Sequence, residues 1–112
     1  MIKRVKLSAF LVANQLDIKG IKSFLDIKPL VDTSSELFYS FGTEKFQYFF
    51  NYGVIVFAGY SDDEMKWAIK AVQVYQRHPI AIWLRDDHEV CVQAGSSMIF
   101  DFDELILDKV DS

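Results

Sequence analysis

Apolar and polar residues alternate along much of the chain, and this alternation predicts several β-strands. Residues 6–13 have apolar side chains on both faces, a pattern typical of a central strand that is covered on each side. Residues 54–57 are β-branched or aromatic, and Gly53 and Gly59 bracket them within the apolar stretch 46–60. The predicted strands are residues 6–13 and 36–41, one within 46–60, and residues 80–84 and 89–93.

Two segments instead show apolar residues at helical spacing. Asp17 is the candidate N-cap of the first helix, which Pro29 ends. Gly20 weakens this helix by about 1 kcal/mol relative to Ala, so we expect it to be short. The second helix begins with a predicted capping box over residues 61–64, and the His-Pro pair at 78–79 ends it.

The order of these elements is strand, helix, strand, strand, helix, strand. Two split β-α-β units in this order make a ferredoxin-like antiparallel sheet with both helices on one face. We expect a polar turn at residues 85–88, followed by a hairpin partner at 89–93. Short apolar pieces at 98–102 and 104–107 predict one or two extra C-terminal strands. The predicted fold class is α+β (β-α-β-β-α-β), as a single domain over residues 1–112.

The composition indicates a folded domain and excludes two classes of small protein, disulfide scaffolds and proteins with a zinc site of several thiolates. Of the 112 residues, 51% are hydrophobic and 15% are aromatic, which is enough to bury a core. The lone Cys91 excludes an internal disulfide and any zinc site that needs several thiolates. We expect Cys91 to be a buried structural thiol.

The charge distribution excludes further classes. The net charge of −4 argues against a general nucleic-acid binder. Residues 1–30 hold six basic and two acidic residues, whereas residues 83–112 hold two basic and eight acidic ones. A solvated surface with no role is the expected interpretation of this polarity. Head-to-tail association, or pairing of the N-terminal strand with the acidic end, is the alternative. No apolar run reaches the ~20 residues of a membrane span, and the N-terminus lacks a signal-peptide core. We therefore expect no membrane insertion and a cytoplasmic location.

Candidates for chemistry are few. Asp86, Asp87 and His88 lie together in the predicted polar turn, and carboxylates with an imidazole are ligands for a divalent metal. Side chains on so short a turn mostly point apart, so a solvated turn is the expected outcome. His78 is expected at the surface near a helix end. There is no Gly-rich phosphate loop and no motif that would activate a serine. We predict no catalytic residue and no cofactor.

The stretch 49–64, FFNYGVIVFAGYSDDE, resembles the signature of the required-for-meiotic-nuclear-division family, which occurs in bacteria and eukaryotes. The likeness consists of Tyr-Gly before a valine-rich strand, then an aromatic residue, a glycine and an acidic helix start. Ala58 stands where Trp is common in the family, and residues 103–107 are similar to a later acidic-apolar strand. The matching residues are Tyr52, Gly53, Val54, Val56, Phe57 and Gly59.

This resemblance implies that the chain corresponds to the N-terminal part of a longer family architecture. Family members usually continue into a helical half, often with a membrane-anchoring C-terminus. The resemblance implies no known enzymatic activity and no transferable catalytic residues. Eukaryotic relatives are linked to mitochondrial translation and inner-membrane assemblies, a role that depends on the helical half.

Strands that are apolar on both faces leave one sheet face bare when both helices lie on the other. That face needs a cover, which can be a second subunit, a missing helical half or the extra C-terminal strands. We therefore expect a non-enzymatic interaction or oligomerisation domain. The alternative is a small-molecule-binding regulatory module with a site at a subunit interface, by analogy with ferredoxin-like sheets. A metal-dependent enzyme using Asp86, Asp87 and His88 is a third hypothesis.

Overall fold

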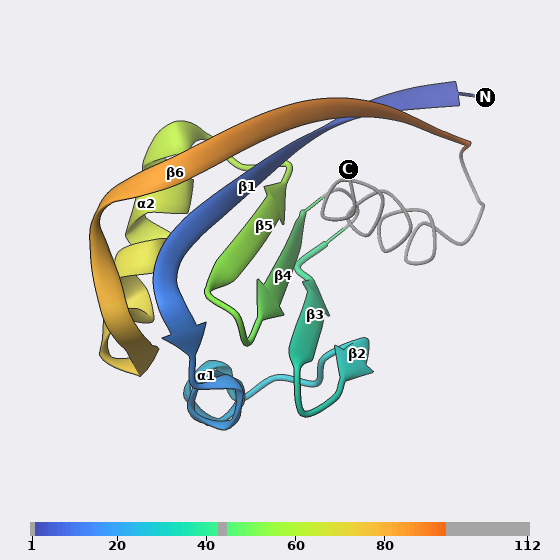
Figure 1. Cartoon of the computed structure of the whole chain (residues 1–112). Coiled ribbons are helices and arrows are strands. Elements are labelled where there is room, and N and C mark those ends of the chain that lie inside the picture. The colour runs from blue at the N-terminus through green and yellow to red at the C-terminus, as the bar shows by residue number, and fades with distance from the viewer. Residues whose placement is uncertain (1, 43–44, 94–112) are drawn as a thin grey trace.

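The computed structural model describes residues 2–42 and 45–93, which form a six-stranded antiparallel sheet with two α-helices (Figure 1). The strand order is β2-β3-β4-β5-β1-β6. The elements, in chain order, are β1 (Ile2–Leu16), α1 (Ile18–Leu25), β2 (Val31–Asp32), β3 (Glu36–Ser40), β4 (Phe46–Phe50), β5 (Val54–Ala58), α2 (Asp62–Ala71), the 3₁₀ turn η1 (Gln73–Tyr75) and β6 (Gln76–Gln93). The predicted α+β class and antiparallel sheet are confirmed.

The strand order differs from that of a simple ferredoxin-like sheet. The apolar stretch 46–60 holds two strands, β4 and β5, separated by a turn at residues 51–53. After α1 the chain therefore crosses to the far edge and returns through β3, β4 and β5 before it reaches α2. Because β5 and β6 both pair antiparallel with β1, the β5-α2-β6 segment is one split β-α-β unit. The predicted order was wrong because hydrophobicity is continuous across the 51–53 turn.

The predicted turn at residues 85–88 was also wrong. β6 is one edge strand of 18 residues, and residues 84–93 each pair with a residue of β1. The register slips between Leu11 and Ala13 of β1, where β6 bulges. Charged residues suit an exposed edge strand, and a 15-residue β1 supplies partners along most of its length. The predicted strands at 98–102 and 104–107 lie outside the described residues.

Residues 2–6 of β1 pair only with residues 89–93 of β6, so the two strands extend past the rest of the sheet (Figure 1). In this arm Lys6 lies opposite Glu89. Arg4 lies opposite Cys91, so Lys6 and Glu89 are the single oppositely charged pair in the register of this arm. Most of the acidic end of the chain lies outside the described residues.

Both helix starts are as predicted. The Asp17 side chain accepts a hydrogen bond from the backbone N–H of Gly20, and α1 has only eight residues. At α2, Ser61 and Glu64 form the reciprocal capping box. Three acidic residues in the first turn of α2 also suit the positive end of the helix dipole.

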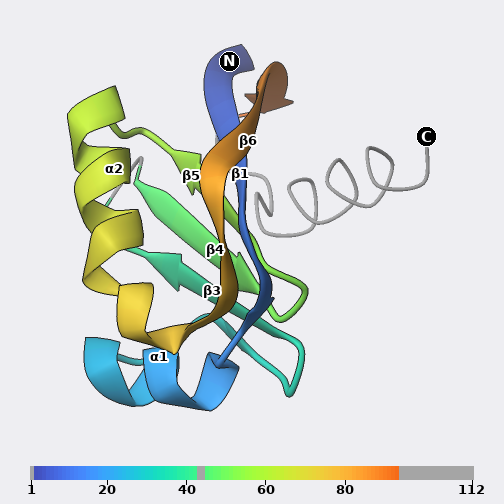
Figure 2. The same cartoon turned by 60° about the vertical axis from the view of Figure 1, so that its left-hand side comes forward.

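The two helices lie on the same side of the sheet (Figure 2). Alternate residues of the strands pack there against Ile18 and Ile21 of α1 and against Met65 and Ile69 of α2. No helix in the described part of the chain is long and apolar enough to cross a membrane.

Candidate functional site

The three candidate metal ligands lie on β6, where they pair with residues 7–9 of β1. Successive strand residues point to opposite faces, so Asp87 lies on the helix side, whereas Asp86 and His88 lie on the other. Nε2 of His88 is 2.9 Å from Oδ2 of Asp86, but not in hydrogen-bond geometry. Within residues 2–42 and 45–93, no three His, Cys, Asp or Glu residues gather in a group that could hold a metal. The strand therefore brings Asp86 and His88 together on one face and places Asp87 on the other.

Asp87 takes part in an ion-pair network centred on Arg85. The Arg85 guanidinium is 2.9 Å from a carboxylate oxygen of Asp62 and 2.9 Å from one of Asp87. It also lies over the ring of Phe10, 5.1 Å from the ring centre. The hydrogen bond from Arg85 holds the pKa of the Asp62 carboxyl below its ordinary value. This network ties the first turn of α2 to the edge strand, which is a structural role.

The residues that carry the family resemblance have structural roles in this fold. Gly53 has a φ of +96°, and a Cβ there would collide with the backbone carbonyl of Ala13. Its own carbonyl accepts a hydrogen bond of 3.0 Å from the N–H of Val12. Gly59 also has a positive φ, of +84°, between β5 and α2. Both glycines therefore permit backbone conformations that other residues rarely adopt.

The other signature residues contribute to the two faces of the sheet. Phe57 is buried on the helix side, whereas Val56 is buried on the opposite face. Val54 packs against the buried apolar residues of the face opposite the helices. The Tyr52 ring stacks on Phe50 with 5.2 Å between ring centres. None of these side chains is an activated nucleophile, acid or base.

The sheet face opposite the helices has an apolar cluster of its own, which we call the second cluster. Its aromatic rings contact one another in sequence: the Phe38 and Tyr48 rings are tilted, with 4.9 Å between their centres, and the Tyr48 ring stacks on Phe50 with 4.4 Å between centres. No helix of the described residues lies over this face (Figure 2). The buried members of the second cluster are Leu7, Phe38, Phe46, Tyr48, Phe50, Val56 and Ala58.

The second cluster continues into exposed apolar side chains at the β6 edge. Phe50 pairs with Val54, Val54 with Leu11, and Leu11 with Leu84. Trp83 contacts Phe10 on the helix side, so its neighbours Ile82 and Leu84 point away from the helices. Leu84 is 62% exposed, Ile82 81% and Tyr52 46%. We call this row the apolar strip: Tyr52, Val54, Leu11, Leu84 and Ile82.

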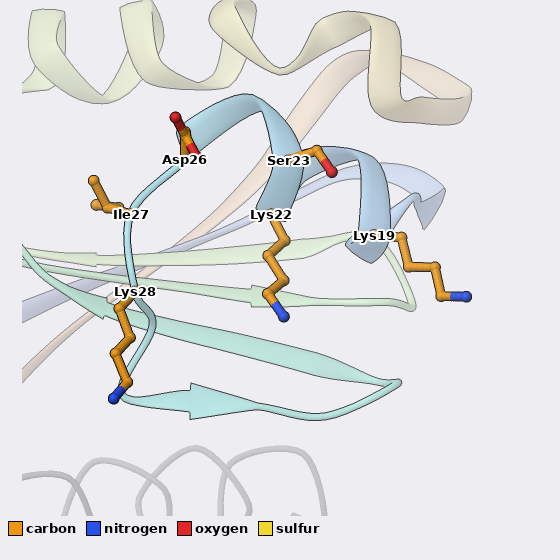
Figure 3. Close-up of a pocket in the computed structure, with 6 residues that line it drawn as sticks. All are labelled: Lys19, Lys22, Ser23, Asp26, Ile27 and Lys28. Carbon is orange, nitrogen blue, oxygen red and sulfur yellow. The ribbon is translucent and has the colours of Figure 1, made fainter.

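Two adjoining grooves flank α1, and both are rich in basic side chains. The first is lined by Lys19, Lys22 and Lys28 together with Ser23, Asp26 and Ile27 (Figure 3). Figure 3 shows Lys22 and Lys28 extending in the same direction, while Lys19 leaves α1 near the start of the helix. The second groove, of about 730 Å³, lies at the end of the sheet where β1 meets α1 and β6 begins.

Comparison of the chain with family models, with curated proteins and with solved structures finds no match to any of them.

Sequence reasoning missed both the apolar strip and the basic grooves. The strip joins residues that are far apart in the chain, such as Tyr52 and Leu84, through the register of three strand pairs. The excess of lysine in the first 30 residues was the available signal for the grooves. Arg77 also lines the second groove, but no sequence pattern indicated this, because the position of Arg77 depends on where β6 begins.

Proposed function

We propose that this protein is a non-enzymatic interaction domain that associates with a second copy of itself through the sheet face opposite the helices. The apolar strip is the observation that supports this proposal. Its exposed members continue a buried aromatic cluster, and a contiguous exposed apolar patch is typical of an interaction site. Apolar residues that are exposed singly are common on protein surfaces and indicate no such site. The family resemblance implies no known enzymatic activity and so names no competing catalytic role.

The surroundings of the strip suit an interface. A stable protein interface buries roughly 1,200–2,000 Å² in total, so the strip would be the apolar centre of a larger contact. Asp86 and His88 lie on the same face, two and four residues beyond Leu84, and would form part of a polar rim. Edge-to-edge pairing through β6 is the less favoured mode, since Pro79, the bulge and the charges at 85–89 all protect that edge.

Light scattering coupled to size exclusion tests the proposal. We expect the native chain to have a mass that is a multiple of its 13.0 kDa monomer. Leu84→Asp and Ile82→Asp should shift the protein toward the monomer, because each places a charge in an apolar contact. Val74→Asp is the matched control: Val74 is 83% exposed but lies in η1, outside the strip.

The expected pattern is dissociation by the two strip variants and not by the control. A native chain that stays monomeric at about 100 μM, well above typical dissociation constants of specific dimers, would overturn the proposal. So would an oligomer that all three variants leave intact. Circular dichroism of each variant shows whether a change in mass reflects lost association or lost folding.

A further inference from the structure

The second groove beside α1 brings together cationic and neutral hydrogen-bond donors from separate parts of the chain. Lys19 and Lys22 come from α1, Arg77 from the start of β6, Asn51 from the β4–β5 turn and Ser34 from the β2–β3 connection. Gln15, at the end of β1, pairs with Arg77 in the sheet register. These groups are distant in sequence and meet only in the folded chain.

Backbone hydrogen bonds join the segments that line the groove. The N–H of Leu16 donates to the carbonyl of Asn51 at 2.9 Å, and the N–H of Asn51 donates to the carbonyl of Ser35 at 2.8 Å. The N–H of Asp17 donates to the carbonyl of Tyr75 at 2.8 Å, which anchors the start of α1 to η1. The backbone under the groove is therefore held by hydrogen bonds, and the side chains of Lys19, Ser34 and Arg77 extend from it into solvent, where a ligand can reach them.

The groove has a small excess of positive charge, since its lining holds three cationic side chains and two carboxylates. The Asp17 carboxylate caps α1 through the N–H of Gly20, and Asp32 forms an ion pair with Lys22. Among the described residues, no carboxylate forms an ion pair with Lys19 or Arg77. An anion bound between these two cations would supply the missing partner.

We propose that this groove binds a phosphate group. A guanidinium presents parallel N–H donors that match phosphate oxygens, and a lysine ammonium adds a compact positive charge. The amide of Asn51 and the hydroxyl of Ser34 are neutral donors that would orient the remaining oxygens. A volume of about 730 Å³ accommodates a small phosphorylated molecule rather than phosphate alone. This inference does not depend on association through the apolar strip.

The phosphate could belong to a soluble molecule or to a lipid headgroup, since the exposed side chains of Ile27 and Leu30 lie close in sequence to the groove residues. Titration of the ¹⁵N-labelled full chain with pyrophosphate, monitored by NMR, tests the soluble source. Flotation with vesicles of phosphatidylcholine, with and without phosphatidic acid, tests the lipid source. Saturable shifts centred on Lys19, Ser34, Asn51 and Arg77 support a soluble ligand. Flotation that requires phosphatidic acid and Arg77, without pyrophosphate shifts, supports a headgroup.

Variants decide whether this groove is responsible. We expect Arg77→Gln and Lys19→Met each to weaken pyrophosphate or vesicle binding about tenfold or more, as for the loss of one charge-assisted hydrogen bond. Lys28→Met is the matched control, because Lys28 lines the first groove but not the second. The proposal is wrong if neither probe binds. It is equally wrong if Lys28→Met weakens binding as much as Lys19→Met, because binding would then follow general positive charge.

Discussion

At the scale of single residues, Gly20 shows how tertiary packing can reverse a helix propensity. Ala at an exposed helix position normally stabilises by roughly 0.5–1 kcal/mol relative to Gly. In α1, however, a Cβ at Gly20 would lie 2.5 Å from Cδ1 of Tyr75 and 2.7 Å from a carboxylate oxygen of Asp17. We therefore expect Gly20→Ala to lower the free energy of unfolding by about 1–3 kcal/mol, the usual cost of overpacking. Urea denaturation of the two proteins measures this difference.

Ser23→Ala is the control for this prediction, since Ser23 is exposed on the same helix and should change stability by less than about 0.5 kcal/mol. A gain in stability for Gly20→Ala would mean that the Tyr75 ring moves aside freely. Sequence reasoning identified Gly20 only as a weak point of the helix, because the ring that makes glycine necessary comes from η1, 55 residues later.

At the scale of elements, the first turn of α2 makes stability depend on pH. The hydrogen bond from the Ser61 backbone, with a further one from Lys45, lowers the pKa of the Glu64 carboxyl from its ordinary value of 4.5. A carboxyl whose pKa is lower in the folded state stabilises the fold above its unfolded pKa, and this contribution is lost as pH falls through the folded pKa. We expect Glu64→Gln to reduce the loss of stability as the pH falls below the ordinary Glu pKa of 4.5, as measured by urea unfolding at each pH. Since Gln can also accept the Ser61 N–H bond, the cap itself should persist at pH 7. Equal slopes in the two proteins would contradict this assignment.

The elements also show what the sequence can and cannot predict. Both helix starts were predictable because capping at Asp17 and Ser61 depends on residues within one turn. The turn at 51–53 was not, since its defining contact is between Gly53 and β1, some 40 residues earlier. The polar stretch 85–88 resembles a turn locally, yet β1 offers each of these residues a partner. Local signals thus predicted where the helices start, and remote pairing decided the strands and the candidate sites. The predicted stop of the second helix at residues 78–79 was wrong, because α2 ends at Ala71 and the His-Pro pair lies in β6, paired with β1.

At the scale of the whole molecule, the two sheet faces make stability depend on protein concentration if the proposed association is correct. The helices α1 and α2 cover one face of the sheet, whereas Leu84 and Ile82 of the apolar strip are exposed in the single chain. A dimer that buries the strip stabilises only the folded state, so each tenfold rise in concentration adds about 1.4 kcal/mol per mole of dimer. We expect the thermal midpoint of the native chain to rise steadily from about 1 to 100 μM, across typical dimer dissociation constants. The Leu84→Asp protein should show one midpoint at all concentrations, and Val74→Asp should behave as the native chain does. A native midpoint that does not change with concentration would show that the strip is not a contact between copies.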